Sequence, residues 1–130
     1  AEEAVENGGN FKEVPEGEYE VQINKMELKE SKTGKPMLSI WFKILDGEYE
    51  NSIIFYNQVL STGFGLHNAD EFLKSLDSGI DVEFKNFKQY NNMIFDIAEA
   101  IENSNLSYAL KYTEGKNGFH NYEITDVYED

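Results

Sequence analysis

Residues 38–44 read LSIWFKI, and their strict alternation decides the fold. One face of this stretch carries four apolar side chains: Leu38, Ile40, Phe42 and Ile44. The opposite face carries Ser39, Trp41 and Lys43. A period of two is typical of a β-strand that packs one face on a core and turns the other toward solvent. The sequence therefore predicts a strand here, and its flanks show what pairs with it.

Strands are expected on both sides of this stretch. A turn at residues 14–17 leads into alternating apolar residues up to Ile23. The alternation then shifts by one position, because the next apolar residue is Met26 rather than residue 25. Such a slip indicates a β-bulge in a long, bent strand. After residue 44, the turn signal Asp46-Gly47 leads into a third strand near residues 48–56. Three consecutive strands predict a meander.

The spacing becomes helical after the third strand. Apolar residues recur at helical intervals: Ala69, Phe72, Leu73 and Leu76. Asn68 and Glu71 form a capping-box pair, so a short helix is expected from Asn68 to near Gly79, after a tight bend at residues 63–65. A second helical stripe runs from Tyr90 to about residue 102, while residues 82–87 fit either a strand or a helix start.

A hairpin closes the pattern. Residues 106–112 alternate, Asn117-Gly118 is a turn signal, and residues 119–128 form the last strand. The order of strands and helices is that of the five-stranded Greek-key OB barrel. We therefore predict a mainly β, α+β domain over residues 11–130, with helices between strands three and four, preceded by a mobile acidic arm at residues 1–10.

Composition limits the function classes. The 130 residues suit one domain, the formal net charge is −14, and there is no cysteine to form a disulfide or a zinc–thiolate site. The apolar runs are too short for a membrane span, and no secretory signal opens the sequence, so a cytoplasmic protein that does not bind membranes is expected. Two histidines, His67 and His120, without metal-ligand or nucleophile spacing predict neither an enzyme nor a cofactor.

Several segments resemble a family of small phage and prophage proteins described as single-stranded-DNA-binding and long classed as a domain of unknown function. The resemblance rests on VPEGEYEV (14–21), ESKTGKPML (30–38), ILDGEY (44–49), FLKSL (72–76) and the closing residues 118–128. It covers nearly everything after residue 10. It implies an OB-like fold and a role in phage DNA replication or recombination inside the bacterial host cell.

The candidate nucleic-acid site comes from the residues themselves. All eleven basic residues are lysines, and residues 21–45 carry five of them against two acids. These five lysines, expected to contact phosphates, are Lys25, Lys29, Lys32, Lys35 and Lys43. The loop expected between strands four and five adds Lys116. The lack of arginine argues against sequence-specific reading of duplex DNA.

Stacking residues are expected on the polar face of strand two and on strand three. Trp41 lies beside Ser39 and Lys43, where a base could stack next to lysines. Packing of Trp41 beneath a helix or in a homo-oligomer interface is the alternative. On strand three we predict Tyr56 for the binding face and Ile53 with Phe55 for the core, although a one-residue slip reverses this assignment.

The C-terminal residues Tyr128, Glu129 and Asp130 could recruit phage or host replication or recombination proteins, as acidic tails do in functionally analogous proteins. The alternative is that Val127 and Tyr128 complete the last strand. At the level of the whole protein, the sequence favours nonspecific single-stranded-DNA binding. The net charge of −14 supports a rival function as an acidic protein-interaction module or DNA mimic.

Overall fold

A computed structural model describes residues 14–114 and 120–129. Its elements are β1 (Gly17–Glu30), β2 (Pro36–Ile44), β3 (Ile53–Val59), α2 (Gly63–Ser75), α3 (Phe87–Asn103), β4 (Leu106–Glu114) and β5 (His120–Glu129). The prediction of a mainly β, α+β protein with its helices between the third and fourth strands is confirmed. The predicted acidic arm and the Asn117-Gly118 turn lie outside the described residues.

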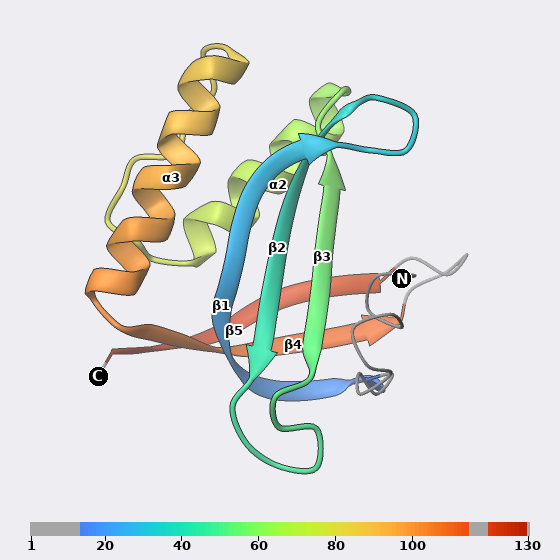
Figure 1. The fold of residues 1–130 in the computed structure, drawn as a ribbon, viewed down its shortest axis with the longest axis vertical. Coiled ribbons are helices and arrows are strands. Elements are labelled where there is room, and N and C mark those ends of the chain that lie inside the picture. The colour runs from blue at the N-terminus through green and yellow to red at the C-terminus, as the bar shows by residue number, and fades with distance from the viewer. Residues whose placement is uncertain (1–13, 115–119, 130) are drawn as a thin grey trace.

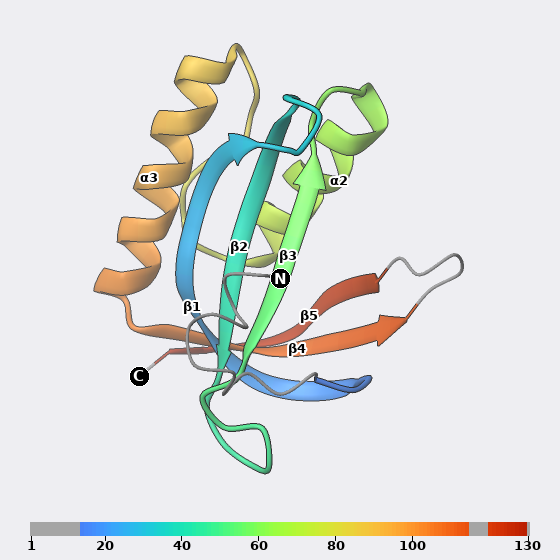
Figure 2. The same ribbon diagram turned by 45° about the vertical axis from the view of Figure 1, so that its right-hand side comes forward.

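The five strands form one antiparallel sheet in the order β3-β2-β1-β4-β5. β1 serves two neighbours, because its first residues pair with β4 while its length from Val21 onward pairs with β2. The register of β1 shifts between Ile23 and Lys25, which confirms the predicted bulge. β1 bends strongly, so the β4–β5 hairpin runs across the direction of β2 and β3 (Figures 1 and 2).

The core lies between this sheet and the two helices. The apolar residues predicted for the core face of β2 are all completely buried: Leu38, Ile40, Phe42 and Ile44. α3 packs on β1, and α2 packs on β3 and β5. Two buried tyrosines bond across this core, since Tyr90 Oη donates to Asp70 Oδ1 (2.7 Å) and Tyr108 Oη donates to the Leu76 carbonyl oxygen (2.8 Å). These bonds fix α2 relative to α3 and β4.

The start of α2 differs from the prediction. The helix begins at Gly63, where Thr62 is the N-cap and its hydroxyl accepts a hydrogen bond from the Gly65 amide (3.0 Å). A Cβ at Gly65 would lie 2.2 Å from the carbonyl oxygen of Val59, so only glycine fits this close approach. The expected bend at residues 63–65 is therefore the first helical turn, and the expected cap at Asn68 lies inside the helix.

The third strand also begins later than predicted. Residues 46–51 form turns, in which the Ser52 amide donates to the Tyr49 carbonyl oxygen (2.9 Å) and Gly47 has a φ of 86°. The strand itself starts at Ile53. Tyrosine and glutamate at residues 48–50 fit a strand by composition, but the chain has not yet reversed direction there.

Candidate nucleic-acid interface

One face of β1, β2 and β3 lies opposite the core. We call it the outer face, and the register defines it by the side chains of Lys25, Glu27, Lys29, Met37, Ser39, Trp41, Lys43, Ile53, Phe55, Asn57 and Val59. Apart from Ser39, each of these residues is half-buried or exposed. Figures 1 and 2 show α2 behind β2 and β3, and α3 beside β1. Neither of the described helices covers the outer face (Figures 1 and 2).

An aromatic pair occupies the middle of the outer face. Trp41 on β2 lies opposite Phe55 on β3, with ring centroids 5.2 Å apart at an interplanar angle of 80°. Lys25, across from Trp41 on β1, places its Nζ 4.8 Å from the centroid of the indole ring and 3.5 Å from Glu27 Oε2. Trp41 and Phe55 are both half-buried. Two aromatic rings beside an ammonium group are the components of a base-stacking platform.

The predicted lysines lie where the strand assignment put them. Lys25 and Lys29 project from β1, Lys32 and Lys35 lie in the loop at its end, and all four are exposed. Lys43, at the other end of β2, is half-buried. On the outer face, three lysines stand against a single glutamate, so its local charge is positive although the chain carries −14. Lys116 lies outside the described residues.

The loop that carries Lys32 and Lys35 is a tight, hydrogen-bonded turn. The amide of Ser31 donates to the carbonyl oxygen of Lys35 (2.7 Å), and the Gly34 amide donates to the Ser31 carbonyl oxygen (2.9 Å). Gly34 has a φ of 80°, which a glycine adopts without strain. These bonds hold Lys32 and Lys35 in a compact turn.

Ser39 lies on the outer face as predicted, but only 1% of it is exposed. Its hydroxyl has no hydrogen-bond partner among the described residues. Its neighbours across the sheet are Glu27 and Asn57. The prediction that Ser39 contacts nucleic acid is therefore wrong for this conformation, because a ligand would first have to displace the surrounding side chains.

The prediction for Tyr56 is also wrong. Tyr56 is 6% exposed and lies on the core face, where its ring stacks on Phe72 of α2 at 4.4 Å and 15° and meets Tyr122 of β5 edge-on at 5.0 Å. Burial raises the pKa of the Tyr56 hydroxyl above its ordinary value. Ile53 and Phe55, assigned to the core from sequence, lie on the outer face. The assignment slipped by one residue, which exchanges the two faces of a strand.

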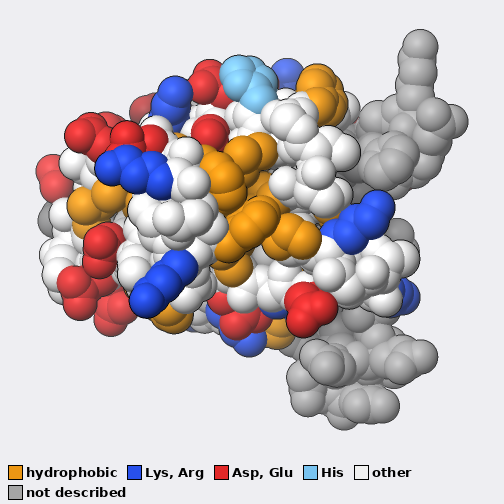
Figure 3. Space-filling model, turned by 90° about the horizontal axis from the view of Figure 1, so that it is seen from above, with side chains coloured by type: hydrophobic (Ala, Val, Ile, Leu, Met, Phe, Trp, Pro, Cys, Tyr) orange, Lys and Arg blue, Asp and Glu red, His pale blue; other side chains and the backbone are white. Residues whose placement is uncertain are grey.

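The structure adds two aromatic residues that the sequence analysis missed. Phe55 belongs to the stacking pair, and Phe64, in the first turn of α2, is 77% exposed. Phe64 lies near the lysine-bearing loop, because the Leu60 amide donates to the Pro36 carbonyl oxygen (2.8 Å) just before α2 begins. Figure 3 looks onto this end of the molecule, where hydrophobic side chains are exposed among both lysines and acidic residues. Phe64 falls outside the apolar stripe of its helix, and that is the signal that could have found it.

The C-terminal residues form part of the sheet rather than a free acidic tail. Tyr128 pairs with Ser107 and Glu129 pairs with Leu106, so β5 continues through both residues. The alternative that the last strand runs through Tyr128 is confirmed, and the strand extends one residue further, to Glu129. Tyr128 remains 42% exposed, and Asp130 lies outside the described residues. Recruitment of a partner by these residues stays a prediction.

Other kinds of site receive no support within the described ranges. Residues 14–114 and 120–129 contain no group of three or more histidine, aspartate or glutamate side chains placed to hold a metal ion. Neither α2 nor α3, the helices of the described chain, combines the length and the apolar composition needed to cross a membrane. His67 is exposed on α2.

These observations define an α+β protein with a five-stranded antiparallel sheet and an open face of aromatic and lysine residues. Residues 2–129 match the family described as "Protein of unknown function (DUF669)". The chain belongs to this family. A search of curated proteins finds no match.

Proposed function

We propose that this protein binds single-stranded DNA across the outer face without sequence preference. The observation that carries the proposal is the Trp41–Phe55 pair, which is accessible in the middle of the face with the ammonium group of Lys25 above the indole. Every base has a flat face, so stacking on such a pair tolerates any sequence. The sequence resemblance described above supports a role in phage DNA replication or recombination.

The sheet order supports an OB-like barrel as the finer description of the fold. An OB barrel opened between its third and fifth strands has the order β3-β2-β1-β4-β5. Across that gap, Tyr122 Oη of β5 donates to the Phe55 carbonyl oxygen of β3 (2.7 Å). In OB folds the face of strands two and three carries nucleic acid, and here that face holds the aromatic pair.

The single-stranded DNA would enter at the loop of Lys32 and Lys35 and run along the outer face. The lysines release counterions as they neutralise phosphates, and Lys25 exchanges its contacts with Glu27 and Trp41 for the backbone of the DNA. Among the described residues of the outer face only Glu27 is acidic, and charges farther than about 8 Å are largely screened at physiological salt. A chain of net charge −14 can therefore bind a polyanion at a locally positive face.

Binding of fluorescein-labelled poly-dT, measured by anisotropy over a range of salt concentrations, tests the proposal. Three to five phosphate contacts predict a slope of log K against log salt of about −2 to −4. The double variant Lys32→Glu/Lys35→Glu should lose most of the affinity. Lys74→Glu/Lys88→Glu makes the same charge change at exposed lysines of α2 and α3 and should keep more of it.

Equal losses in the two double variants would mean that only net charge matters, and the outer face would not be the site. Preference for duplex over single-stranded DNA would also overturn the proposal. Absence of any DNA binding at low salt would favour the rival function, an acidic module that binds proteins or mimics DNA, for which the net charge of −14 is the supporting observation.

A further inference from the structure

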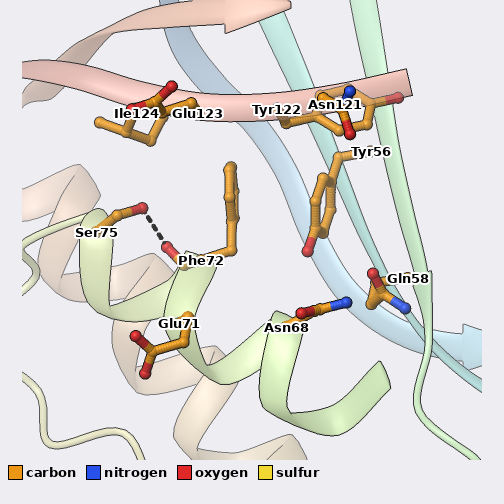
Figure 4. Close-up of a pocket in the computed structure, with 10 residues that line it drawn as sticks. All are labelled: Tyr56, Gln58, Asn68, Glu71, Phe72, Ser75, Asn121, Tyr122, Glu123 and Ile124. Atoms are coloured by element: carbon orange, nitrogen blue, oxygen red, sulfur yellow. Dashed lines mark hydrogen bonds between the residues drawn. The ribbon is translucent and has the colours of Figure 1, made fainter. Parts of the chain in front are cut away.

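A second concave surface lies on the opposite side of β3 from the outer face. It is an open cavity of ≈ 530 Å³ between α2 and the facing parts of β3 and β5, and we call it the α2–β5 groove. Figure 4 shows Phe72 and Tyr56 as its walls, with side chains of α2 below them and of β5 above. The side chains of Trp41 and Phe55 lie on the outer face, so the proposed DNA path does not use this groove.

A tyrosine hydroxyl that opens into the groove has no hydrogen-bond partner among the described residues. Tyr56 is 6% exposed, yet its Oη makes no hydrogen bond with any described residue, and in Figure 4 it points toward Asn68. The side chain of Asn68 also lacks a hydrogen bond within the described structure. The other deeply buried tyrosines, Tyr90 and Tyr108, both donate a hydrogen bond. The Tyr56 hydroxyl lines the open groove without a partner, so it is available to a ligand.

The groove also runs along two open strand edges. In the described sheet β3 pairs only with β2, and β5 pairs only with β4. Two outward-pointing carbonyl oxygens of β3 accept from side chains, Phe55 from Tyr122 Oη (2.7 Å) and Val59 from Gln58 Nε2 (3.1 Å). The N–H and C=O groups of successive residues point to alternate sides of a strand, so those of Asn57, two residues from both Phe55 and Val59, point away from β2 as well. An extended peptide can bond to backbone groups placed in this way.

The charge of the groove selects among ligands. Glu71 and Glu123 line it, and none of the described residues that line it is a lysine. Lys74 reaches Glu71 from outside the groove, with its Nζ 3.2 Å from Oε2, and both side chains are more than half exposed. A phosphate would meet two carboxylates here, whereas a cationic side chain would be attracted. The groove is therefore unsuited to nucleic acid.

We propose that the α2–β5 groove docks an extended, lysine- or arginine-bearing peptide segment of a partner protein. The segment lies along the open edge of β3, its backbone bonds to Tyr56 Oη and the Asn68 amide, and its basic side chains reach Glu71 and Glu123. An apolar side chain of the segment packs on Phe72. Protein docking at this surface is a function separate from DNA binding, and it stands whether or not the outer face binds DNA.

The probe is a fluorescein-labelled peptide of alternating lysine and valine, titrated by anisotropy against the full chain. Tyr56→Phe removes the hydroxyl and keeps the stacked ring, so it should fold normally and weaken binding about fivefold, the effect of one hydrogen bond. Glu71→Gln/Glu123→Gln should weaken binding about tenfold or more. The matched control Glu99→Gln/Glu102→Gln removes two exposed charges of α3 and should change the affinity less than about twofold.

Amide chemical shifts recorded with the peptide give the decisive location. Shifts concentrated on α2, β3 and β5, together with unchanged poly-dT affinity in Tyr56→Phe, support the proposal and separate it from DNA binding. Equal weakening by the groove and control carboxylate variants, or shifts spread over acidic residues of the whole surface, would overturn it. Amide shifts of the groove residues on addition of poly-dT in place of the peptide would also overturn it.

Discussion

Replacing Trp41 with alanine should weaken poly-dT binding by about 5- to 30-fold while the fold persists. Stacking of one base on an aromatic side chain contributes roughly 1–3 kcal/mol. In the free protein, Lys25 Nζ already lies 4.8 Å from the centroid of the indole ring, a contact that contributes about 0.5–1 kcal/mol at an exposed position. A base must displace this ammonium group before it stacks, so the net loss on truncation is about 1–2 kcal/mol.

The cost to stability should be small, because Trp41 lies on the outer face. Its contact with Phe55, at 5.2 Å and 80°, contributes about 0.5–1.5 kcal/mol beyond the area that it buries. Trp41 is the only tryptophan, so its fluorescence reports on this position alone, and poly-dT should quench it. Phe95→Ala truncates another aromatic residue, 59% exposed on α3 away from the proposed path, and serves as the control.

Two results would refute this reasoning. The first is poly-dT binding by the native protein without any change in tryptophan fluorescence, together with equal affinities for Trp41→Ala and Phe95→Ala. The second is a large fall in the free energy of unfolding of Trp41→Ala with unchanged DNA affinity. That outcome would assign Trp41 to packing or to an interface between copies of the chain, the alternative that the sequence left open.

The remaining predictions concern the core. Phe72→Ala removes the ring that stacks on a buried tyrosine and should lower the free energy of unfolding in urea by about 3–5 kcal/mol; a loss below about 1 kcal/mol would contradict the packing described. Gly65→Ala should lower the free energy of unfolding by about 1–3 kcal/mol, because the new Cβ meets a backbone oxygen of β3. In the control Gly63→Ala the new Cβ meets nothing within 4 Å, so this variant should be neutral or slightly stabilising. Equal effects of the two variants on the thermal midpoint would reject the close approach. Burial raises the pKa of Tyr90 and Tyr108 above 10.0, so their neutral forms stabilise the folded state fully below about pH 10. As the pH rises from there through the folded-state pKa, the free energy of unfolding should fall by up to about 1.4 kcal/mol per pH unit for each group. Urea titrations at increasing alkaline pH, with tyrosinate absorbance as a second signal, test this, and complete tyrosine ionisation near pH 10 in the folded protein would contradict it.

Sequence periodicity predicted the elements whose faces differ most in polarity. Residues 38–44 of β2 alternate strictly, and the four apolar residues of their core face are all buried. The bulge in β1 followed from a single phase slip before Met26, and the stripe of α3 followed from helical spacing. In each case one face is apolar and the other polar, so the burial direction is encoded locally.

β3 could not be assigned in this way, because Ile53, Ile54, Phe55 and Tyr56 place apolar residues on both faces. Only the register with β2, which puts Phe55 opposite Trp41, decides which of them face outward. The start of α2 was missed for a related reason. Gly63 and Gly65 are poor helix formers, and it is the Thr62 cap and the close approach to β3 that begin the helix there. Both features depend on contacts between segments that local propensity does not contain.

The candidate site shows the same division. Trp41 and Lys43 lie on the face of β2 where the alternation put them, since that strand was correctly phased. Tyr56 was predicted for the binding face and Phe55 for the core, and the structure has them the other way round. The burial of Ser39 is a property of three adjacent strands, whose side chains close over a small residue, and it could not be read from one strand alone.

The double pairing of β1 has a consequence for the order in which the chain can acquire structure. The contacts from Val21 to Glu30 are made with β2, only a short loop away, and can form soon after both segments leave the ribosome. Gly17, by contrast, pairs with Tyr112, so the first residues of β1 cannot pair with β4 until almost the whole polypeptide has been synthesised. Closing so long a loop is entropically slow. The opening residues of β1 therefore lack their partner strand until β4 has been synthesised, and an unpaired strand edge can associate with chaperones or with another nascent chain.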